Sequence, residues 1–445
     1  MNGSNPIMST RPSLPQNDEL SRLTRRGFLR VALVSAGVVS MGTLSASLLS
    51  GCAHPRPQIP GTEITLVHWY HQYGEKGTED AVLRYAAQYT KAHPKIGVAV
   101  VWVPGDYQTK LNTALLTAGG PDVFEKQLTL PMVSAGQVAP LDDLFAPGIR
   151  EDFLEGDLKV NAADGKIYGL KTINDTGVLY FRKSWMEKAA LGLPKTLAEL
   201  EEAAKKLTVK GRKGLFIGND GGAGALANIL PWSAGEDFLV DDKIVFATPR
   251  AAKSLEALRE LNTSGSLLIG APTDWWDPSA FTQGLCAMQW GGLWAFPVIR
   301  DTLKEDFGTM AWPAFDEKGT PATFAGGWSQ MVNASSPFIE EAKAYIRWLW
   351  IENRAIQQDW SLSYGFHVPP RRSVAASAKG LDDPRAAVAV EALAKYGRYL
   401  PPAWTASMNT ALGDAIANII KGSPGLPELQ AAKAKCEREL QRLLR

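Results

Sequence analysis

The sequence is poor in cysteine and histidine and carries almost no net charge. Its 445 residues include three cysteines and five histidines, and the formal net charge is +1. A near-neutral chain offers no basic surface for nucleic acid or an anionic membrane, so no nucleic-acid partner is expected. Cys286 and Cys436 stand in no metal-type spacing and form no disulfide framework. We expect two buried free thiols, with a disulfide between them as the alternative.

The motifs of common catalytic and cofactor sites are scarce as well. The sequence contains no Gly-x-Ser-x-Gly elbow and no His-Glu-x-x-His helix. His68 and His71 would point to opposite faces of a strand, which argues against a metal site. Residues 222–227, Gly-Ala-Gly-Ala-Leu-Ala, superficially match a dinucleotide fingerprint, but they lie far from the first βαβ unit and predict a loop that begins a helix. We expect neither a metal nor a cofactor.

Residues 1–51 have the features of an export signal. Arg25 and Arg26 precede an uncharged run, residues 31–51, that is rich in Ala, Ser, Gly and Val. This arrangement resembles a twin-arginine signal. A transmembrane helix is the alternative because the run is long enough to span a membrane, although its Ser and Gly residues weaken that interpretation.

The end of this run resembles a bacterial lipobox. Leu49-Ser50-Gly51-Cys52 would be cut before Cys52, whose thiol would then be lipidated, and an ordinary signal peptide is the alternative. Residues 52–61 include three prolines and predict a stiff, extended tether. We therefore expect an exported protein that is anchored by lipid to the outer face of the cell membrane.

The remaining chain is too long for one core and predicts two α/β domains. An apolar strand at 64–70, a helix at 78–93 and a second strand at 96–103 form a βαβ unit, which implies a parallel sheet. In residues 165–182, two apolar runs flank the polar residues Asn174, Asp175 and Thr176. A strand that leaves one sheet and enters another through such an elbow makes a hinge beside a cleft.

Beyond the elbow the α/β pattern starts again. Thr196 and Glu199 form a capping box for a helix that runs to Leu207, and strands are predicted at 214–218 and 285–290. A long helix begins at Ser336, and the last eighty residues are helical segments. The pattern as a whole predicts two α/β units and a helical tail.

The sequence resembles the bacterial extracellular solute-binding proteins of ABC importers, in the sugar-binding family that includes maltose-binding protein. Eight motifs carry the resemblance, in the family's order, over residues 62–370. They lie at residues 64–70, 120–124, 139–143, 164–170 with 179–182, 194–200, 284–294, 326–328 and 365–369. The segment 284–294, Gly-Leu-Cys-Ala-Met-Gln-Trp-Gly-Gly-Leu-Trp, is the most specific, although the family's usual Gly-Pro-Trp is Gly-Leu-Trp here.

The resemblance implies an α/β protein with the two-lobed periplasmic-binding-protein fold, type II-like, whose discontinuous lobes are joined by hinge crossings. The first lobe would comprise residues 62–174 and 310–362, and the second 175–309 and 363–445. The chain would cross near 172–175, 307–313 and 363–369. The family implies a non-catalytic, monomeric receptor that binds a carbohydrate, such as a di- or oligosaccharide, and delivers it to an ABC permease.

A sugar site needs amides and carboxylates for the hydroxyls and flat aromatic rings for the apolar faces. For each Trp candidate the alternative is core packing. The candidates are Trp69, Tyr70, His71, Glu125, Gly327 and Trp328 in the first lobe, Asp175 at the hinge, and Trp232, Trp275, Trp276 and Trp294 in the second lobe. The alternative for Asp175 is a turn-forming residue.

Two enzyme classes remain as alternatives. A twin-arginine-dependent oxidoreductase would share the export signal, and a secreted glycoside hydrolase would share the many Trp and carboxylate residues. A bound, absorbing cofactor would favour the first, and turnover of a glycoside would favour the second. A sequence does not show whether two carboxylates face each other across a cleft.

Overall fold

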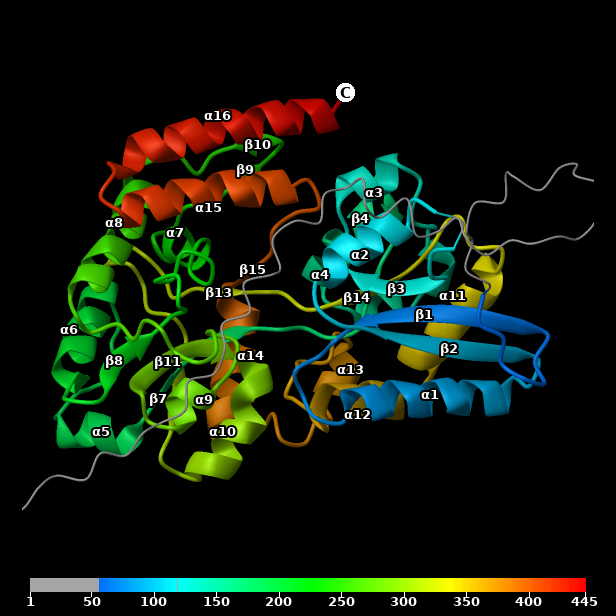
Figure 1. The fold of residues 1–445 in the computed structure, drawn as a ribbon, viewed down its shortest axis with the longest axis horizontal. Coiled ribbons are helices and arrows are strands. Elements are labelled where there is room, and N and C mark those ends of the chain that lie inside the picture. The colour runs from blue at the N-terminus through cyan, green and yellow to red at the C-terminus, as the bar shows by residue number, and fades with distance from the viewer. Residues whose placement is uncertain (1–55, 118) are drawn as a thin grey trace, which may run out of the picture. The chain divides into compact units, whose positions relative to one another are not determined.

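Two separate β-sheets organise the chain in the computed structural model, which describes residues 56–117 and 119–445 (Figure 1). The first sheet has five strands in the order β2-β1-β3-β14-β6. Strand β1 runs parallel to β2 and β3, and β14 is antiparallel to β3 and β6. The strands are β1 (Ile64–His71), β2 (Ile96–Val103), β3 (Val123–Lys126), β6 (Leu170–Lys171) and β14 (Ser329–Val332).

Helices pack on this sheet because each presents an apolar stripe to it. In α1 (Thr78–Ala92), Val82, Tyr85, Ala86 and Tyr89 lie on one face of the helix and are buried. The other helices of the first lobe include α2 (Tyr107–Ala114), α11 (Ile339–Arg347) and α12 (Arg354–Leu362). The Asp106 carboxylate accepts a hydrogen bond from the Thr109 N–H and caps α2. The βαβ prediction is confirmed.

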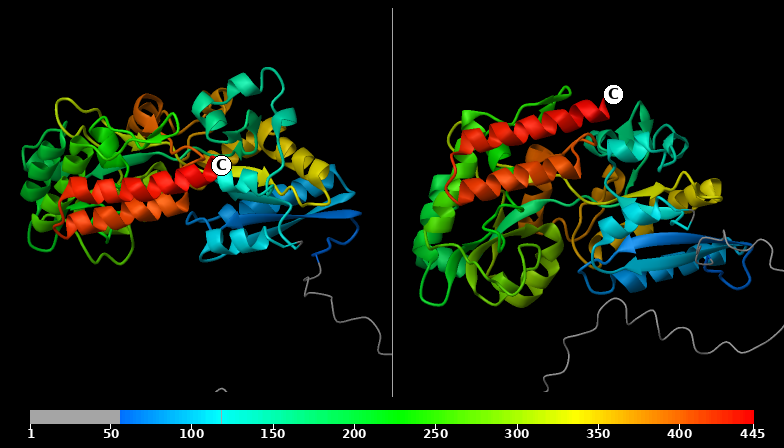
Figure 2. Two further views of the ribbon diagram at one scale, coloured as in Figure 1. Left: turned by 90° about the horizontal axis from the view of Figure 1, so that it is seen from above. Right: turned by 45° about the horizontal axis from the view of Figure 1, so that its top comes forward.

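The second sheet has four strands in the order β12-β7-β11-β8. They are β7 (Gly177–Phe181), β8 (Lys213–Phe216), β11 (Cys286–Gly292) and β12 (Gly308–Met310). Strand β7 is antiparallel to both neighbours, and β11 is parallel to β8. The helices of this lobe include α6 (Leu197–Leu207), α7 (Ile229–Ser233), α8 (Pro249–Thr263), α10 (Phe296–Leu303), α14 (Pro384–Tyr396), α15 (Ala406–Ile420) and α16 (Gly425–Leu443). The last two helices lie side by side and pack on α8 (Figure 2).

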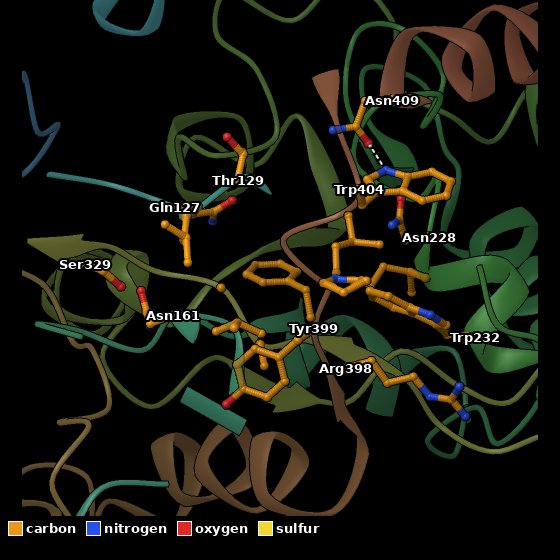
Figure 3. A pocket seen from close by; sticks show the side chains of 18 of the residues that line it. Gln127, Thr129, Asn161, Asn228, Trp232, Ser329, Arg398, Tyr399, Trp404 and Asn409 are labelled. Carbon is orange, nitrogen blue, oxygen red and sulfur yellow. Dashed lines mark hydrogen bonds between the residues drawn. The ribbon is translucent and has the colours of Figure 1, made fainter. Parts of the chain in front are cut away.

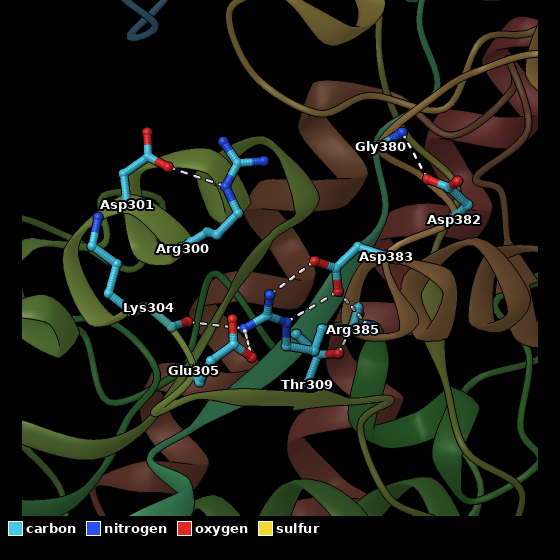
Figure 4. A network of polar contacts seen from close by, with 9 residues as sticks. All are labelled: Arg300, Asp301, Lys304, Glu305, Thr309, Gly380, Asp382, Asp383 and Arg385. Carbon is cyan, nitrogen blue, oxygen red and sulfur yellow. Dashed lines mark hydrogen bonds and ion pairs between the residues drawn. The ribbon is translucent and has the colours of Figure 1, made fainter.

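A polar network ties α14 to the edge of the second sheet (Figure 4). The Arg385 guanidinium donates two hydrogen bonds to the Asp383 carboxylate, at 3.0 and 2.8 Å, and one to the Lys304 carbonyl at 2.9 Å. The Thr309 hydroxyl of β12 donates to the Arg385 carbonyl. These contacts attach α14 to the second lobe. Between β12 and α14 the chain passes through the first lobe and returns.

The predicted polar elbow connects the two sheets, since β6 belongs to the first and β7 to the second. Two other crossing segments lie against it. Asn174 pairs with Val368, with both N–H to carbonyl distances at 2.9 Å, and the Gly326 N–H donates to the Asp175 carbonyl at 2.9 Å. The three crossings are therefore hydrogen-bonded to one another in one narrow strip.

The middle crossing differs from the expected position near 307–313. The apolar run there forms β12, at the edge of the second sheet, and Met310 and Trp312 are buried in that lobe's core. Strand β13 (Thr323–Phe324) then pairs with β15 (Gly397–Arg398), and the chain returns to the first sheet only at β14. An apolar strand pattern predicts a strand but does not tell which of two sheets it joins.

Other local predictions can be compared directly. The Thr196 hydroxyl accepts from the Glu199 N–H at 3.3 Å, which confirms the capping residue of α6. The long helix expected from Ser336 begins at Ile339 and is interrupted before α12. Cys286 and Cys436 are both buried and free. Within residues 56–117 and 119–445, no helix is long and apolar enough to cross a membrane. The export signal and Cys52 lie outside the described residues.

Candidate functional site

A cavity of about 320 Å³ lies between the two lobes (Figure 3). One wall comes from the first lobe, in the strands and loops that carry Gln127, Thr129, Asn161, Lys171 and Ser329. The opposite wall and the rim come from the second lobe and the tail, with Gly224, Ala225, Asn228, Ile229, Trp232, Trp275, Phe324, Arg398, Tyr399, Leu400, Pro401, Trp404 and Asn409. Residues of both lobes can therefore contact a ligand in the cavity.

The second-lobe wall holds buried hydrogen-bond donors without partners among the described residues. The Trp232 indole N–H and the Asn228 side-chain amide nitrogen are both buried and donate to no described acceptor. The two residues are close together because Asn228 is the N-cap of α7 and Trp232 lies within that short helix. A buried donor without an acceptor costs about 1–3 kcal/mol, and an acceptor that reached these two groups would offset that cost.

The neighbouring donors are already used within the protein. The Trp404 indole N–H donates to the Asn409 side-chain oxygen at 2.7 Å (Figure 3). The Tyr399 hydroxyl donates to the buried Asp157 carboxylate at 2.9 Å. Burial, followed by the charge of Asp157, raises the pKa of Tyr399 well above its ordinary value. Tyr399 and Trp404 thus present mainly their ring surfaces to the cavity.

Two of the first-lobe candidates, His71 and Trp328, lie beside a third, Glu125. This buried carboxylate accepts hydrogen bonds from the His71 N–H at 2.8 Å and the Tyr73 hydroxyl at 2.9 Å, and it also contacts the His71 ring. The His71 and Trp328 rings stack with centroids 3.9 Å apart. The Gln127 amide, which lines the cavity, donates to the Gly327 carbonyl at 3.4 Å and joins this group to the cavity wall.

The second-lobe tryptophans form another group beside the cavity. The Trp275 ring lines the cavity and lies with its centroid 5.9 Å from that of Trp294. Trp294 in turn lies 6.4 Å from Phe324, which also lines the cavity, and its indole N–H donates to the Trp276 carbonyl at 2.9 Å. Trp276 is 52% exposed. These rings form an aromatic surface that adjoins the cavity wall.

The hinge carries a buried histidine between two carboxylates. His367 Nδ1 lies 2.5 Å from Asp175 Oδ1, and His367 Nε2 lies 3.4 Å from Glu75 Oε1. Burial lowers the pKa of His367, but the charges and hydrogen bonds of Asp175 and Glu75 outweigh it and raise the pKa to about 10. Asp175 and His367 come from two of the crossing segments, and Glu75 comes from the loop between β1 and α1. Asp175 is therefore an ion-pair partner rather than a free turn residue.

The structure places the sequence candidates unequally. Trp232 and Trp275 line the cavity, whereas Trp294, Trp276, His71, Glu125 and Trp328 belong to the two adjoining groups. Tyr70 is buried in the first core, where its hydroxyl accepts from the Gln330 amide at 3.0 Å. Trp69 packs against the core of the first lobe on the face that carries α2.

Gly327 has a different role from the one expected. Its φ of +99° is in the left-handed region, and a Cβ there would lie 2.2 Å from the Ile173 carbonyl oxygen. The glycine therefore permits two hinge crossings to approach closely, and the neighbouring Gly326 is the one that lines the cavity. Within the described residues, no group of three or more His, Cys, Asp or Glu side chains could hold a metal ion.

Sequence reasoning missed Lys171, Asn161, Asn228, Tyr399 and Trp404. Asn228 directly follows the Gly/Ala-rich segment 222–227. The sequence predicted a loop and a helix start there, but it did not indicate that Asn228 would line a cavity. Tyr399 and Trp404 flank a Pro-Pro pair in the tail, and no local pattern tells that this loop folds back to the cleft.

Comparison with known proteins identifies the family. The family model for bacterial extracellular solute-binding protein matches residues 75–349, more than half of the chain. The chain belongs to this family. The arabinooligosaccharide-binding protein of Bacillus subtilis (strain 168) is 24% identical over 331 residues, 71% of this chain and 76% of its own length. The maltooligosaccharide ABC transporter solute-binding lipoprotein of Streptococcus pneumoniae serotype 4 is 23% identical over 346 residues, 71% of this chain and 76% of its own length.

Solved structures agree with the two-lobed fold. The GacH receptor of Streptomyces glaucescens, solved unliganded and in complex with acarbose, superposes with a TM-score of 0.72 at 23% identity. The match covers 86% of this chain and 98% of the receptor. At this identity the likeness shows the fold alone.

Proposed function

We propose that this protein is the substrate-binding lipoprotein of an ABC transporter, that it captures a di- or oligosaccharide in the cavity between its lobes, and that it delivers this cargo to the permease. The observation that carries the proposal is a cavity between two lobes whose wall combines aromatic rings with buried, unpartnered N–H donors. Sugar hydroxyl oxygens accept such hydrogen bonds, and the C–H faces of a sugar pack on aromatic rings. Two relatives named for oligosaccharides support the proposal.

We expect a non-catalytic, monomeric receptor that closes on its cargo. A ligand shifts the lobes toward a closed state only by binding that state better than the open one, which requires contacts from both lobes. Gln127 and Asn161 supply polar groups on the first wall, and Asn228 and Trp232 supply donors on the second. Lipid attachment at Cys52 would hold the receptor at the outer face of the membrane, beside the permease.

The test is a thermal-shift and calorimetric screen of the purified protein against oligosaccharides, monosaccharides and redox cofactors. A ligand that binds only the folded state at a hundredfold excess over its Kd adds about 2.7 kcal/mol to stability. We expect a rise in Tm with an oligosaccharide and none with cofactors. No response to any saccharide would refute the proposal, and release of free sugar from an added glycoside would favour a hydrolase.

A matched pair of variants locates the binding site. Trp232→Phe removes the indole N–H while it keeps an aromatic ring, and we expect it to weaken oligosaccharide binding about tenfold. Trp312→Phe is the control, because Trp312 is equally buried in the same lobe, also has an unpartnered N–H and does not line the cavity. Equal losses of affinity in both variants would mean that the cavity is not the binding site.

A further inference from the structure

Two buried lysines lie in one row across the first sheet, at the cavity wall. The register pairs Lys126 of β3 with Ser329 of β14, and Ser329 with Lys171 of β6. Residues paired in this way project from the same face of a sheet, so the three side chains are lateral neighbours. Ser329 and Lys171 line the cavity, and Lys126 stands behind Ser329.

Burial of these ammonium groups is unusual and costly. Lys126 is 9% exposed and Lys171 is 4% exposed, and lysine is almost never buried to this degree without a partner. The Lys126 ammonium donates to the Asn112 side-chain oxygen, whereas Lys171 has neither a hydrogen bond nor an ion pair among the described residues. Burial lowers the pKa of both lysines.

The carboxylates nearest to Lys171 are committed to other donors. Asp157 and Asp175 both favour the charged form of Lys171, but neither forms an ion pair with it. Asp157 accepts from the Asn174 amide at 2.7 Å and from the Tyr399 hydroxyl at 2.9 Å. Asp175 is bound by His367. The three donor positions of the Lys171 ammonium are therefore open to whatever fills the cavity.

The opposite wall also carries hydrogen-bond donors. Trp232 and Asn228 line that wall, and each has a buried N–H donor without an acceptor among the described residues. A neutral sugar hydroxyl can satisfy such donors, but it does not compensate a buried charge. An oxyanion does both, because it accepts several hydrogen bonds and carries the opposite charge.

We propose that Lys171 and Ser329, with Lys126 behind them, form an oxyanion subsite, so that the cargo of this receptor is an acidic saccharide that carries a carboxylate or a phosphate group. This inference rests on the proposed saccharide-binding function. The ammonium of Lys171 contacts the anionic group directly, and Lys126 contributes positive potential within the same low-dielectric wall.

The test is calorimetric titration of the full-length protein, purified in detergent, with three oligosaccharide sets of matched length. One set is neutral, one contains uronic acid residues and one carries a phosphate monoester. We expect the protein to prefer one acidic set over the neutral set by about tenfold or more, and the preference to shrink as salt is raised. The preferred set tells whether the anion is a carboxylate or a phosphate.

Variants assign that preference to the lysine. Lys171→Met keeps the length of the side chain and removes the charge, and we expect it to abolish the preference for the acidic set and to leave neutral binding nearly unchanged. Lys171→Arg should retain part of the preference. Lys166→Met, at an exposed lysine of the same lobe, is the matched control and should change nothing. Circular dichroism checks folding, and Lys171→Gln replaces the Met variant if that one fails to fold.

The outcomes separate the two proposals. Binding of neutral and acidic sets with equal affinity by the unmodified protein would overturn the oxyanion subsite while the receptor function stands. An equal loss for both sets in Lys171→Met would also overturn it, because the lysine would then serve ordinary hydroxyls or the fold. Failure of every set to bind would remove both proposals together.

Discussion

Replacement of His367 by Gln should change how the stability of the protein depends on pH. The histidine lies between Asp175 and Glu75 at the hinge, and these partners raise its pKa from an ordinary 6.5 to about 10. In the unfolded chain the imidazole loses its proton near its ordinary pKa, whereas in the folded protein it keeps the proton to much higher pH. Folding and proton binding are therefore linked through this residue.

The sign follows from the raised pKa. Below pH 6.5 the imidazole is charged in both states, so its ion pairs contribute fully to stability. As the pH rises from 6.5 to about 10 this contribution is lost, at about 1.4 kcal/mol per pH unit. The whole interval corresponds to roughly 5 kcal/mol, a large fraction of the stability of a typical protein.

The assay is denaturant unfolding at several pH values between 6 and 10, with the unmodified protein and the His367→Gln variant compared. The unmodified protein should lose stability steadily over this range, and the variant should be less stable at pH 6 and should lose less as the pH rises. His93→Gln, at an exposed histidine, is the control. Parallel loss of stability in the unmodified protein and the His367→Gln variant would show that the hinge does not hold a charged imidazole.

Four other substitutions test separate parts of the molecule. Trp294→Ala should abolish saccharide binding with little change in Tm, and a large fall in Tm would instead assign the ring to the core. Gly327→Ala should destabilise the protein by about 1–3 kcal/mol in denaturant unfolding, because its Cβ would collide with the Ile173 carbonyl at a positive φ; Gly413→Ala, in the open interior of α15, should stabilise it by about 0.5–1 kcal/mol. Cys52→Ala should move the protein from the membrane fraction to the soluble fraction, and continued membrane attachment would point to an uncleaved helix.

Local patterns predicted much of the fold. Strand β2 was expected over residues 96–103 and occupies Ile96–Val103, because an uninterrupted apolar run between Pro94 and Pro104 leaves few alternatives. The polar elbow at Asn174 correctly marks the passage from one sheet to the other. The crossing at 307–313 was misplaced because the partner of an edge strand is chosen by tertiary packing against β7, which no local signal specifies.

The site was less predictable, for two physical reasons. An aromatic residue that contacts a ligand and one that fills a core have the same local sequence signal. The sequence therefore did not distinguish Trp232, which lines the cavity, from Tyr70, which is buried in the core. The polar groups of the walls are also brought together from distant segments. Asn228 and Tyr399 are far apart in the sequence, and only the folded chain shows that both line one cavity.

In the proposed site, the two walls of the cavity supply different groups to the cargo, and this arrangement would favour closure. The charged group, Lys171, lies on the first lobe, and the neutral donors of Asn228 and Trp232 lie on the second. A cargo held only by the lysine would leave the second-lobe donors unpaired, and a cargo held only by those donors would leave a buried charge uncompensated. Each wall is therefore satisfied only when both lobes contact the same molecule. Because the crossings at the hinge form one narrow hydrogen-bonded strip, we expect the proposed closure to be a rotation about that strip.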